Sequence, residues 1–224
     1  DGKGRTWIAG KHLLSVRDMN LSQRIGDLLD AGVTSFKIEG RLKDLAYIRN
    51  VVAHYRRAVD EALALRPGLV RSSVGESVPD FTPDPSKSFT RGESDYFLDG
   101  KRAGVASFDT PKAVGERVGR VAGVSGGTFT LDGAHDLAPG DGICFLTPRG
   151  VTGTNVNAVE GRRITPNRMA GITPGAEVRR HFDRRFTLAV ERSRTRRVIP
   201  AKAAAEATAE GLKLTYTDCE GVAA

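Results

Sequence analysis

The sequence predicts a mixed α+β protein made of several parts. Three observations lead to this prediction. Two short apolar runs alternate with two helical patterns near the N-terminus, a stretch rich in proline, serine and glycine follows, and six closely spaced β-rich runs come after it. The first pattern is typical of the last two βα units of a (β/α)8-type barrel, and the third of a small antiparallel β-barrel. The predicted regions are residues 1–66, 67–104, 105–190 and 191–224.

The first region alternates strand and helix patterns. Residues 7–16 form an apolar run that predicts a strand, and residues 21–31 carry apolar side chains on one helical face before Gly32, a good residue to end a helix. Residues 34–39 predict a second strand, and residues 45–63 predict a longer helix because their apolar positions repeat about every 3.6 residues. Two strands alone do not make a stable sheet, so we expect this region to be the tail of a truncated barrel whose other units precede residue 1.

The remaining regions change in character. Residues 67–104 begin with the composition of a linker, and in the third region turn residues rather than helices separate the β-rich runs. The last region reads as the start of a further β-rich domain. Alanine propensity would favour a helix at residues 201–209, whereas the alternation of Leu212, Leu214 and Tyr216 favours strand, turn, strand, which we prefer. The predicted barrel strands are 117–124, 128–131, 141–147, 153–159, 163–165 and 177–182.

Composition and charge narrow the class of protein. The formal net charge is +7 and arginine pairs recur along the chain, which favours a polyanionic partner, with a solvated arginine-rich surface as the alternative. No run approaches the roughly 18 apolar residues of a spanning helix, so we expect no membrane partner. Cys144 and Cys219 are too few for a disulfide scaffold or a complete metal site, and they indicate a reducing compartment.

The run at residues 35–41 holds the best candidates for chemistry. Alternation places its apolar side chains on one face of the predicted strand and Lys37, Glu39 and Arg41 on the other. In a barrel strand covered by helices, the charged face points into the barrel, whose carboxyl end carries the chemistry of such enzymes. A structural ion pair that fills the barrel is the alternative. Asp18, just past the preceding strand, either joins this site or helps to cap the helix that starts near Leu21.

Two other patterns have plainer interpretations. Residues 123–127 match G-x-S-x-G, but a nucleophile elbow lies between a strand and a helix, and here a second strand is predicted to follow. We therefore interpret the match as a hairpin turn. Arg49, Arg56 and Arg57 have the spacing of a solvent-exposed helix face. On its residues, the chain is not a self-sufficient protease.

The string SFKIEGR at residues 35–41 belongs to a longer pattern that resembles the end of the catalytic barrel in the collagenase-like peptidase family, U32. The later part of the chain is similar to the long branch of this family, in which the activity is hydroxylation of ribosomal RNA. Together these matches cover nearly the whole chain. The residues that carry the resemblance are 12–19, 30–44, Tyr47, Tyr55, Arg56, 89–98 and 115–182.

The resemblance implies that the intact protein is an iron–sulfur-dependent RNA hydroxylase that makes 5-hydroxycytidine in 23S ribosomal RNA. It implies a [4Fe–4S] cluster with ligands outside this chain, so we expect no cofactor and no metal ligand within it. The expected partner is ribosomal RNA rather than DNA, and the expected location is the cytoplasm. The candidate barrel-mouth residues are Asp18, Lys37, Glu39 and Arg41, and the candidate RNA-binding residues are Arg56, Arg57, Arg91, Arg162 and Arg163.

The resemblance leaves two alternatives open. One is proteolysis of collagen-like substrates by the intact protein, which is the family's inherited label. The other is a non-catalytic RNA-binding module, which salt-dependent binding to ribosomal RNA fragments would support.

Overall fold

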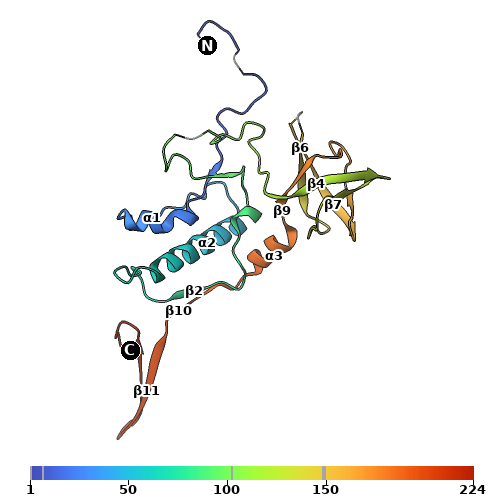
Figure 1. Cartoon of the computed structure of the whole chain (residues 1–224). Coiled ribbons are helices and arrows are strands. Elements are labelled where there is room, and N and C mark those ends of the chain that lie inside the picture. The colour runs from blue at the N-terminus through green and yellow to red at the C-terminus, as the bar shows by residue number, and fades with distance from the viewer. Residues whose placement is uncertain (1, 7, 102, 148–149) are drawn as a thin grey trace.

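The computed structural model describes residues 2–6, 8–101, 103–147 and 150–224. Two α-helices lie side by side, a small β-barrel lies beside them, and a two-stranded hairpin extends away from both (Figure 1). No helix within these ranges is long and apolar enough to cross a membrane. The helices are α1 (Ile25–Asp30), α2 (Leu45–Ala64) and α3 (Arg184–Arg192), with 3-10 turns η1 at Ser22–Arg24 and η2 at Pro85–Lys87.

Six antiparallel strands close into a barrel in the order β4-β5-β8-β7-β6-β9. Shifts in the register, such as the one between Arg117 and Gly119, are β-bulges that help the sheet to curve. Each strand falls where the sequence predicts one, so the predicted antiparallel barrel is confirmed. The strands are β4 (Glu116–Ser125), β5 (Thr128–Leu131), β6 (Gly142–Thr147), β7 (Gly150–Glu160), β8 (Arg163–Pro166) and β9 (Glu177–Phe182).

The barrel has an apolar core that its inward-facing side chains fill. The rings of Phe129 and Phe145 meet edge to face with their centroids 5.6 Å apart. Around them, Ile143, Ile164 and Val178 are fully buried. Because a closed barrel leaves no edge strand unpaired, this part of the chain can fold around its own core.

The two strands predicted in the first region are not formed among the described residues. Residues 8–15 and 34–39 belong to no strand, and Val16 makes only an isolated bridge to Ala106. Parallel strands are stabilised by hydrogen bonds to neighbouring strands, and the described chain supplies no partner for residues 34–39. The helices α1 and α2 are confirmed, whereas the (β/α)8-type barrel is not.

The region predicted to begin as a linker is tied into the rest of the fold. A parallel ladder joins β1 (Asp18–Met19) to β3 (Glu93–Ser94), and an antiparallel ladder joins β2 (Glu76–Val78) to β10 (Arg196–Val198). In addition, the buried side chain of Asn50 on α2 bonds both the N–H and the C=O of Asp84, as well as Ser88. These contacts hold the segment between residues 76 and 94 against α2, β1 and β10.

The last region forms strand, turn, strand, so that preference is confirmed and the helix alternative is wrong. Strand β11 (Ala201–Thr208) pairs along its length with β12 (Gly211–Asp218). Leu212, Leu214 and Tyr216 each lie opposite an alanine of β11, which makes one face of the hairpin apolar. All three side chains are largely exposed.

We expect only one of the two cysteines to react while the chain is folded. Cys144 lies buried in β6, where its Sγ donates to the carbonyl of Val114 at 3.7 Å and burial raises the pKa of the thiol to about 11. Cys219 is exposed. Because the thiolate is the nucleophile, a thiol-specific colorimetric reagent at about pH 8 should label Cys219 alone, and both cysteines in denaturant. Equal labelling rates in the folded chain would contradict the barrel packing around Cys144.

Candidate functional site

Asp18 and Arg91 form the central pair of a polar cluster beside α2. The parallel ladder between β1 and β3 brings the two residues together across the chain. The Oδ2 atom of Asp18 accepts from the backbone N–H of Arg91 at 2.8 Å and from its Nε at 3.3 Å, while Oδ1 accepts from Nη2 at 2.9 Å. Both carboxylate oxygens are therefore occupied by Arg91. The alternative role of Asp18 as a helix cap is wrong, because Asn20 accepts the N–H of Ser22 instead.

An aromatic ring with two cations around it adjoins this pair. The Nζ atom of Lys43 lies 3.1 Å from the centroid of the Phe89 ring, and the guanidinium of Arg91 lies 5.8 Å from the same centroid. Burial lowers the pKa of Lys43, although the negative charge of Asp18 opposes the shift. Burial also raises the pKa of Tyr47, and Asp18 adds to that effect. The carboxylate of Asp18 thus offsets positive charge in a site of cations and aromatic rings, and Asp44 adds a smaller negative contribution at Lys43.

The three charged residues of the predicted strand do not join this cluster through their side chains. Lys37, Glu39 and Arg41 are exposed, and the described residues show no ion pair between any of them and Asp18. Glu39 instead accepts the backbone N–H of Arg41 at 2.9 Å. The predicted alternation is seen in the exposure of the side chains: Phe36 and Ile38 are half-buried, whereas Lys37 and Glu39 are exposed. Their role as barrel-mouth residues stays a prediction.

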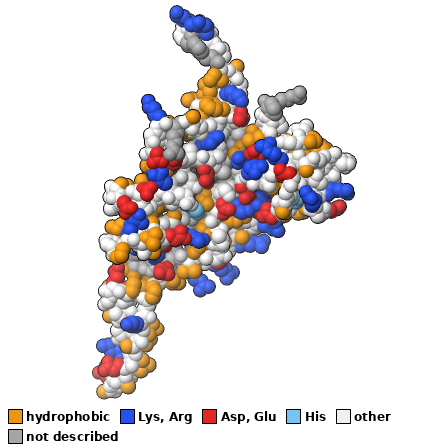
Figure 2. Space-filling view, in the orientation of Figure 1, with side chains coloured by type: hydrophobic (Ala, Val, Ile, Leu, Met, Phe, Trp, Pro, Cys, Tyr) orange, Lys and Arg blue, Asp and Glu red, His pale blue; other side chains and the backbone are white. Residues whose placement is uncertain are grey.

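The candidate RNA-binding arginines lie in three separate places. Arg56 and Arg57 make i,i+4 ion pairs with Asp60 and Glu61 on α2, as expected of a helix surface. Arg162 lies at the turn between β7 and β8 and donates to the carbonyl of Leu131, and the neighbouring Arg163 is exposed. Only Arg91 belongs to the cluster around Asp18. Figure 2 likewise shows basic side chains interspersed with acidic ones over this face rather than one continuous basic patch.

The arginine face expected on α2 is only partly exposed. Arg49, taken from its spacing as a solvent-facing residue, donates to the backbone carbonyls of Val190 and Glu191 at 3.1 and 2.6 Å. These carbonyls belong to the last turn of α3, where a cation is favoured. The arginine therefore fastens α3 to α2.

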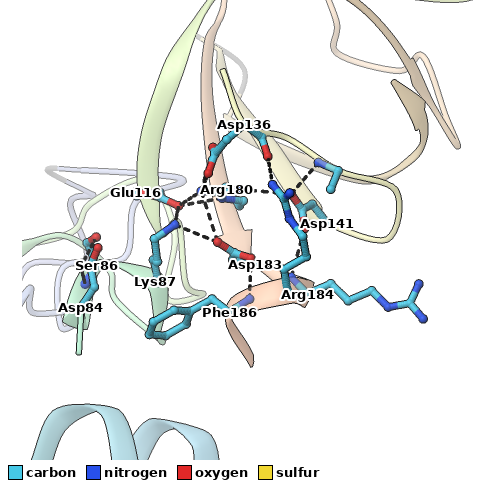
Figure 3. Close-up of polar contacts among 12 residues, drawn as sticks. Asp84, Ser86, Lys87, Glu116, Asp136, Asp141, Arg180, Asp183, Arg184 and Phe186 are labelled. Carbon is cyan, nitrogen blue, oxygen red and sulfur yellow. Dashed lines mark hydrogen bonds and ion pairs between the residues drawn. The ribbon is translucent and has the colours of Figure 1, made fainter. Parts of the chain in front are cut away.

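A second charged cluster lies at the junction of the barrel and η2, centred on Arg180 of β9 (Figure 3). The side chain of Arg180 is only 2% exposed and reaches four carboxylates, and Lys87 on η2 bonds two of them. The contacts of Arg180 are with Glu116 at 2.5 Å, Asp136 at 3.1 Å, Asp141 at 3.3 Å and Asp183 at 3.3 Å.

Hydrogen bonding between Lys87 and Asp183 offsets the effect of burial on the pKa of each. Burial by itself would raise the pKa of Asp183, but bonds from Lys87 and from the N–H of Phe186 more than offset it and hold the pKa below its usual value. Burial likewise opposes the charge of Lys87, yet the bond to Asp183 leaves the pKa of Lys87 raised. Every charged side chain of the cluster has a partner of opposite charge. We therefore interpret the cluster as a structural contact that attaches η2 to the barrel rather than as a reactive centre.

The chain's own residues do not fit a [4Fe–4S] cluster. Such a cluster is held by several cysteine thiolates, and the chain has two cysteines. Cys144 is a buried thiol with a raised pKa in the barrel, and Cys219 follows β12 in the C-terminal hairpin. Among the described residues, no group of three or more His, Cys, Asp or Glu side chains could hold a metal ion.

Several residues of the Asp18 cluster were missed as site candidates. Lys43 and Phe89 meet across 46 positions of sequence, and nothing in their local patterns indicates the contact. Tyr47 and Lys43 lie within the segments that carry the family resemblance, and this resemblance was the one signal in the sequence that could have indicated them as site residues.

Residues 1–106 match the model of peptidase family U32. This part of the chain belongs to the family. A relative of the chain is the 23S rRNA 5-hydroxycytidine C2501 synthase of Escherichia coli (strain K12), 36% identical over 231 aligned positions that cover 99% of this chain and 35% of that protein. The chain therefore spans about a third of the length of this curated relative.

Two further relatives match over smaller parts. The tRNA hydroxylation protein P of Escherichia coli (strain K12) is 25% identical over 63% of the chain and 30% of its own length. The tRNA hydroxylation protein P2 of Bacillus subtilis (strain 168) is 41% identical over 23% of the chain and 16% of its own length. No solved structure matches the chain.

Proposed function

We propose that this U32 chain is part of an enzyme that hydroxylates ribosomal RNA and makes 5-hydroxycytidine in 23S RNA. The observation that carries this proposal is the extent of similarity. The family match ends at residue 106, before the β-barrel, whereas similarity to the rRNA 5-hydroxycytidine synthase continues over 99% of the chain. Similarity to the rRNA enzyme thus runs through the whole barrel at 36% identity, whereas the tRNA hydroxylation protein P of Escherichia coli matches 63% of the chain at 25% identity, which favours rRNA over tRNA as the substrate.

In this proposal, the chain contributes to substrate handling and other parts of the protein supply the redox chemistry. The segments around α1 and α2 would be βα units of a larger barrel, in which residues 34–39 find the neighbouring strands that they lack here. A [4Fe–4S] cluster would be held by cysteines elsewhere in the protein and would supply the oxidation. Asp18, Lys37, Glu39 and Arg41 would lie at the barrel mouth, and the enzyme would act in the cytoplasm.

The peptidase alternative finds little support among the described residues. Residues 123–125 end β4, and Gly126 and Gly127 make the predicted hairpin turn to β5, where the hydroxyl of Thr128 donates to the carbonyl of Ser125 at 2.7 Å. Because Thr128 continues as a strand, this serine is not at the start of a helix as a nucleophile elbow requires. The family label therefore does not by itself make this chain a protease.

We expect deletion of the gene to abolish 5-hydroxycytidine in 23S RNA. Nucleoside mass spectrometry of 23S RNA from the deletion strain measures the modification, and complementation with the intact gene should restore it. Other modified nucleosides in the same digest serve as the internal control. Unchanged 5-hydroxycytidine in the deletion strain would overturn the proposal.

A further inference from the structure

A groove of about 490 Å³ lies between the β-barrel and the loops that pack on β1. Its barrel side is formed by residues of β4, β6, β7 and β9, and its other side by loop residues near 90–93 and 106–110. The volume is within the range of roughly 300–1,000 Å³ that is usual for ligand sites. The groove thus joins the Asp18 cluster to the barrel that this chain shares with its rRNA-modifying relative.

Four arginines line this groove, and they differ in how far they are already neutralised. Arg17 is exposed, and the described residues show no hydrogen bond or ion pair to its guanidinium. Arg117 is 53% exposed, and its nearest carboxylate, on Glu177, is 3.8 Å away. In contrast, Arg91 is bonded to Asp18 and Arg179 to Glu177. Arg17 and Arg117 therefore have donors available for a ligand, one on each side of the groove.

The acidic residues of the groove are mostly engaged elsewhere. Glu116 is bonded by Arg180 and Lys87, and Asp109 is paired with Lys11 at 2.5 Å. Glu93 is the remaining carboxylate among the described lining residues. A negatively charged ligand would therefore meet an excess of positive charge, which favours phosphate groups.

An exposed aromatic ring completes the groove. Phe108 is 45% exposed although it is a large apolar residue, and it lies on the wall opposite the barrel. Its backbone is fixed, because the carbonyl of Phe108 accepts the N–H of His12 at 2.9 Å and the adjacent Ser107 donates its N–H to Ser15 at 2.7 Å. A half-exposed ring on a tethered backbone, in a groove that arginines also line, is the kind of surface on which unpaired bases stack in proteins that bind single-stranded nucleic acid.

We propose that this groove binds a single-stranded segment of the RNA substrate, with phosphates at Arg17 and Arg117 and one unpaired base stacked on Phe108. This inference rests on the proposed function, since the substrate is taken to be RNA. A duplex would fit poorly, because base pairing hides the base faces that a ring such as Phe108 contacts.

The test compares matched substitutions in the intact protein. Arg17→Gln combined with Arg117→Gln should weaken binding to a fluorescent single-stranded 23S RNA fragment and lower the slope of log affinity against log salt by about 1.4, the value for two lost phosphate contacts. Phe108→Ala should weaken binding about tenfold, as expected for one lost stacked base. Arg120→Gln is the control, since Arg120 lies on the same strand β4, is 52% exposed and is outside the groove.

The outcomes separate this inference from the proposed function. If Arg120→Gln weakens binding as much as the double variant, or if Phe108→Ala binds single strands and a matched duplex as the unchanged protein does, the groove proposal is wrong. Thermal unfolding of each variant shows whether a loss of binding reflects a loss of folding. If the groove variants lose RNA binding as expected while deletion of the gene leaves 5-hydroxycytidine unchanged, only the proposed reaction fails.

Discussion

Replacing Arg180 with methionine is expected to destabilise the barrel by about 3–5 kcal/mol. The guanidinium of Arg180 is almost completely buried and is the common partner of four carboxylates. Asp141 is fully buried and Asp183 nearly so, so removal of the cation leaves negative charges uncompensated inside the protein. Lys87 bonds Asp183 and Glu116, and it cannot replace the contact with Asp141. Urea denaturation followed by circular dichroism measures the change.

The neighbouring Arg179 provides the matched control for that substitution. Arg179 lies on the same strand, but its side chain is 26% exposed and pairs with Glu177, which is itself partly exposed. Because solvent screens such a pair, Arg179→Met should cost only about 1 kcal/mol. Equal effects of the two substitutions would mean that the buried cluster does not stabilise the junction between η2 and the barrel.

The barrel could be predicted from the sequence because its signals are local. Its strands are short β-rich runs, most of them with alternating burial, and glycine or proline marks most of the turns between them. The same alternation places Arg180 on the inward face together with Val178, so a signal for the buried arginine was present in the predicted strand at 177–182. Asp183 follows the strand directly, but the other three carboxylate partners, Glu116, Asp136 and Asp141, come from other parts of the chain and could not be found in this way.

The first region was harder to predict because its strands depend on distant partners. Residues 34–39 have the alternation of a strand, yet a strand forms only where a neighbour supplies hydrogen bonds, and periodicity says nothing about neighbours. The candidate site has the same difficulty. Asp18 and Arg91 are 73 positions apart, and only the ladder between β1 and β3 shows that they meet.

The contact between Asp18 and Arg91 leads to the largest expected effect on activity. Asp18→Ala in the intact protein should lower the formation of 5-hydroxycytidine at least about tenfold, which corresponds to roughly 1.4 kcal/mol. The substitution removes three hydrogen bonds and leaves the half-buried guanidinium of Arg91 unpaired beside Lys43. Hydrogen bonds to charged groups contribute about 1.5–3 kcal/mol each, so the loop that carries Arg91 loses much of its attachment to β1. Mass spectrometry of 23S RNA from complemented deletion strains measures the effect.

Two further variants decide whether Asp18 acts by position or by charge. Asp18→Asn keeps an oxygen that can accept the backbone N–H of Arg91, so a positioning role predicts activity between those of Asp18→Ala and the unchanged protein. Asp27→Ala removes an exposed carboxylate that pairs with Arg24 on the protein surface, and it should leave activity unchanged. If Asp18→Asn is as inactive as Asp18→Ala and both unfold at the normal temperature, the positioning role is wrong. The carboxylate itself would then be required at the barrel mouth, where its two oxygens must first be released by Arg91.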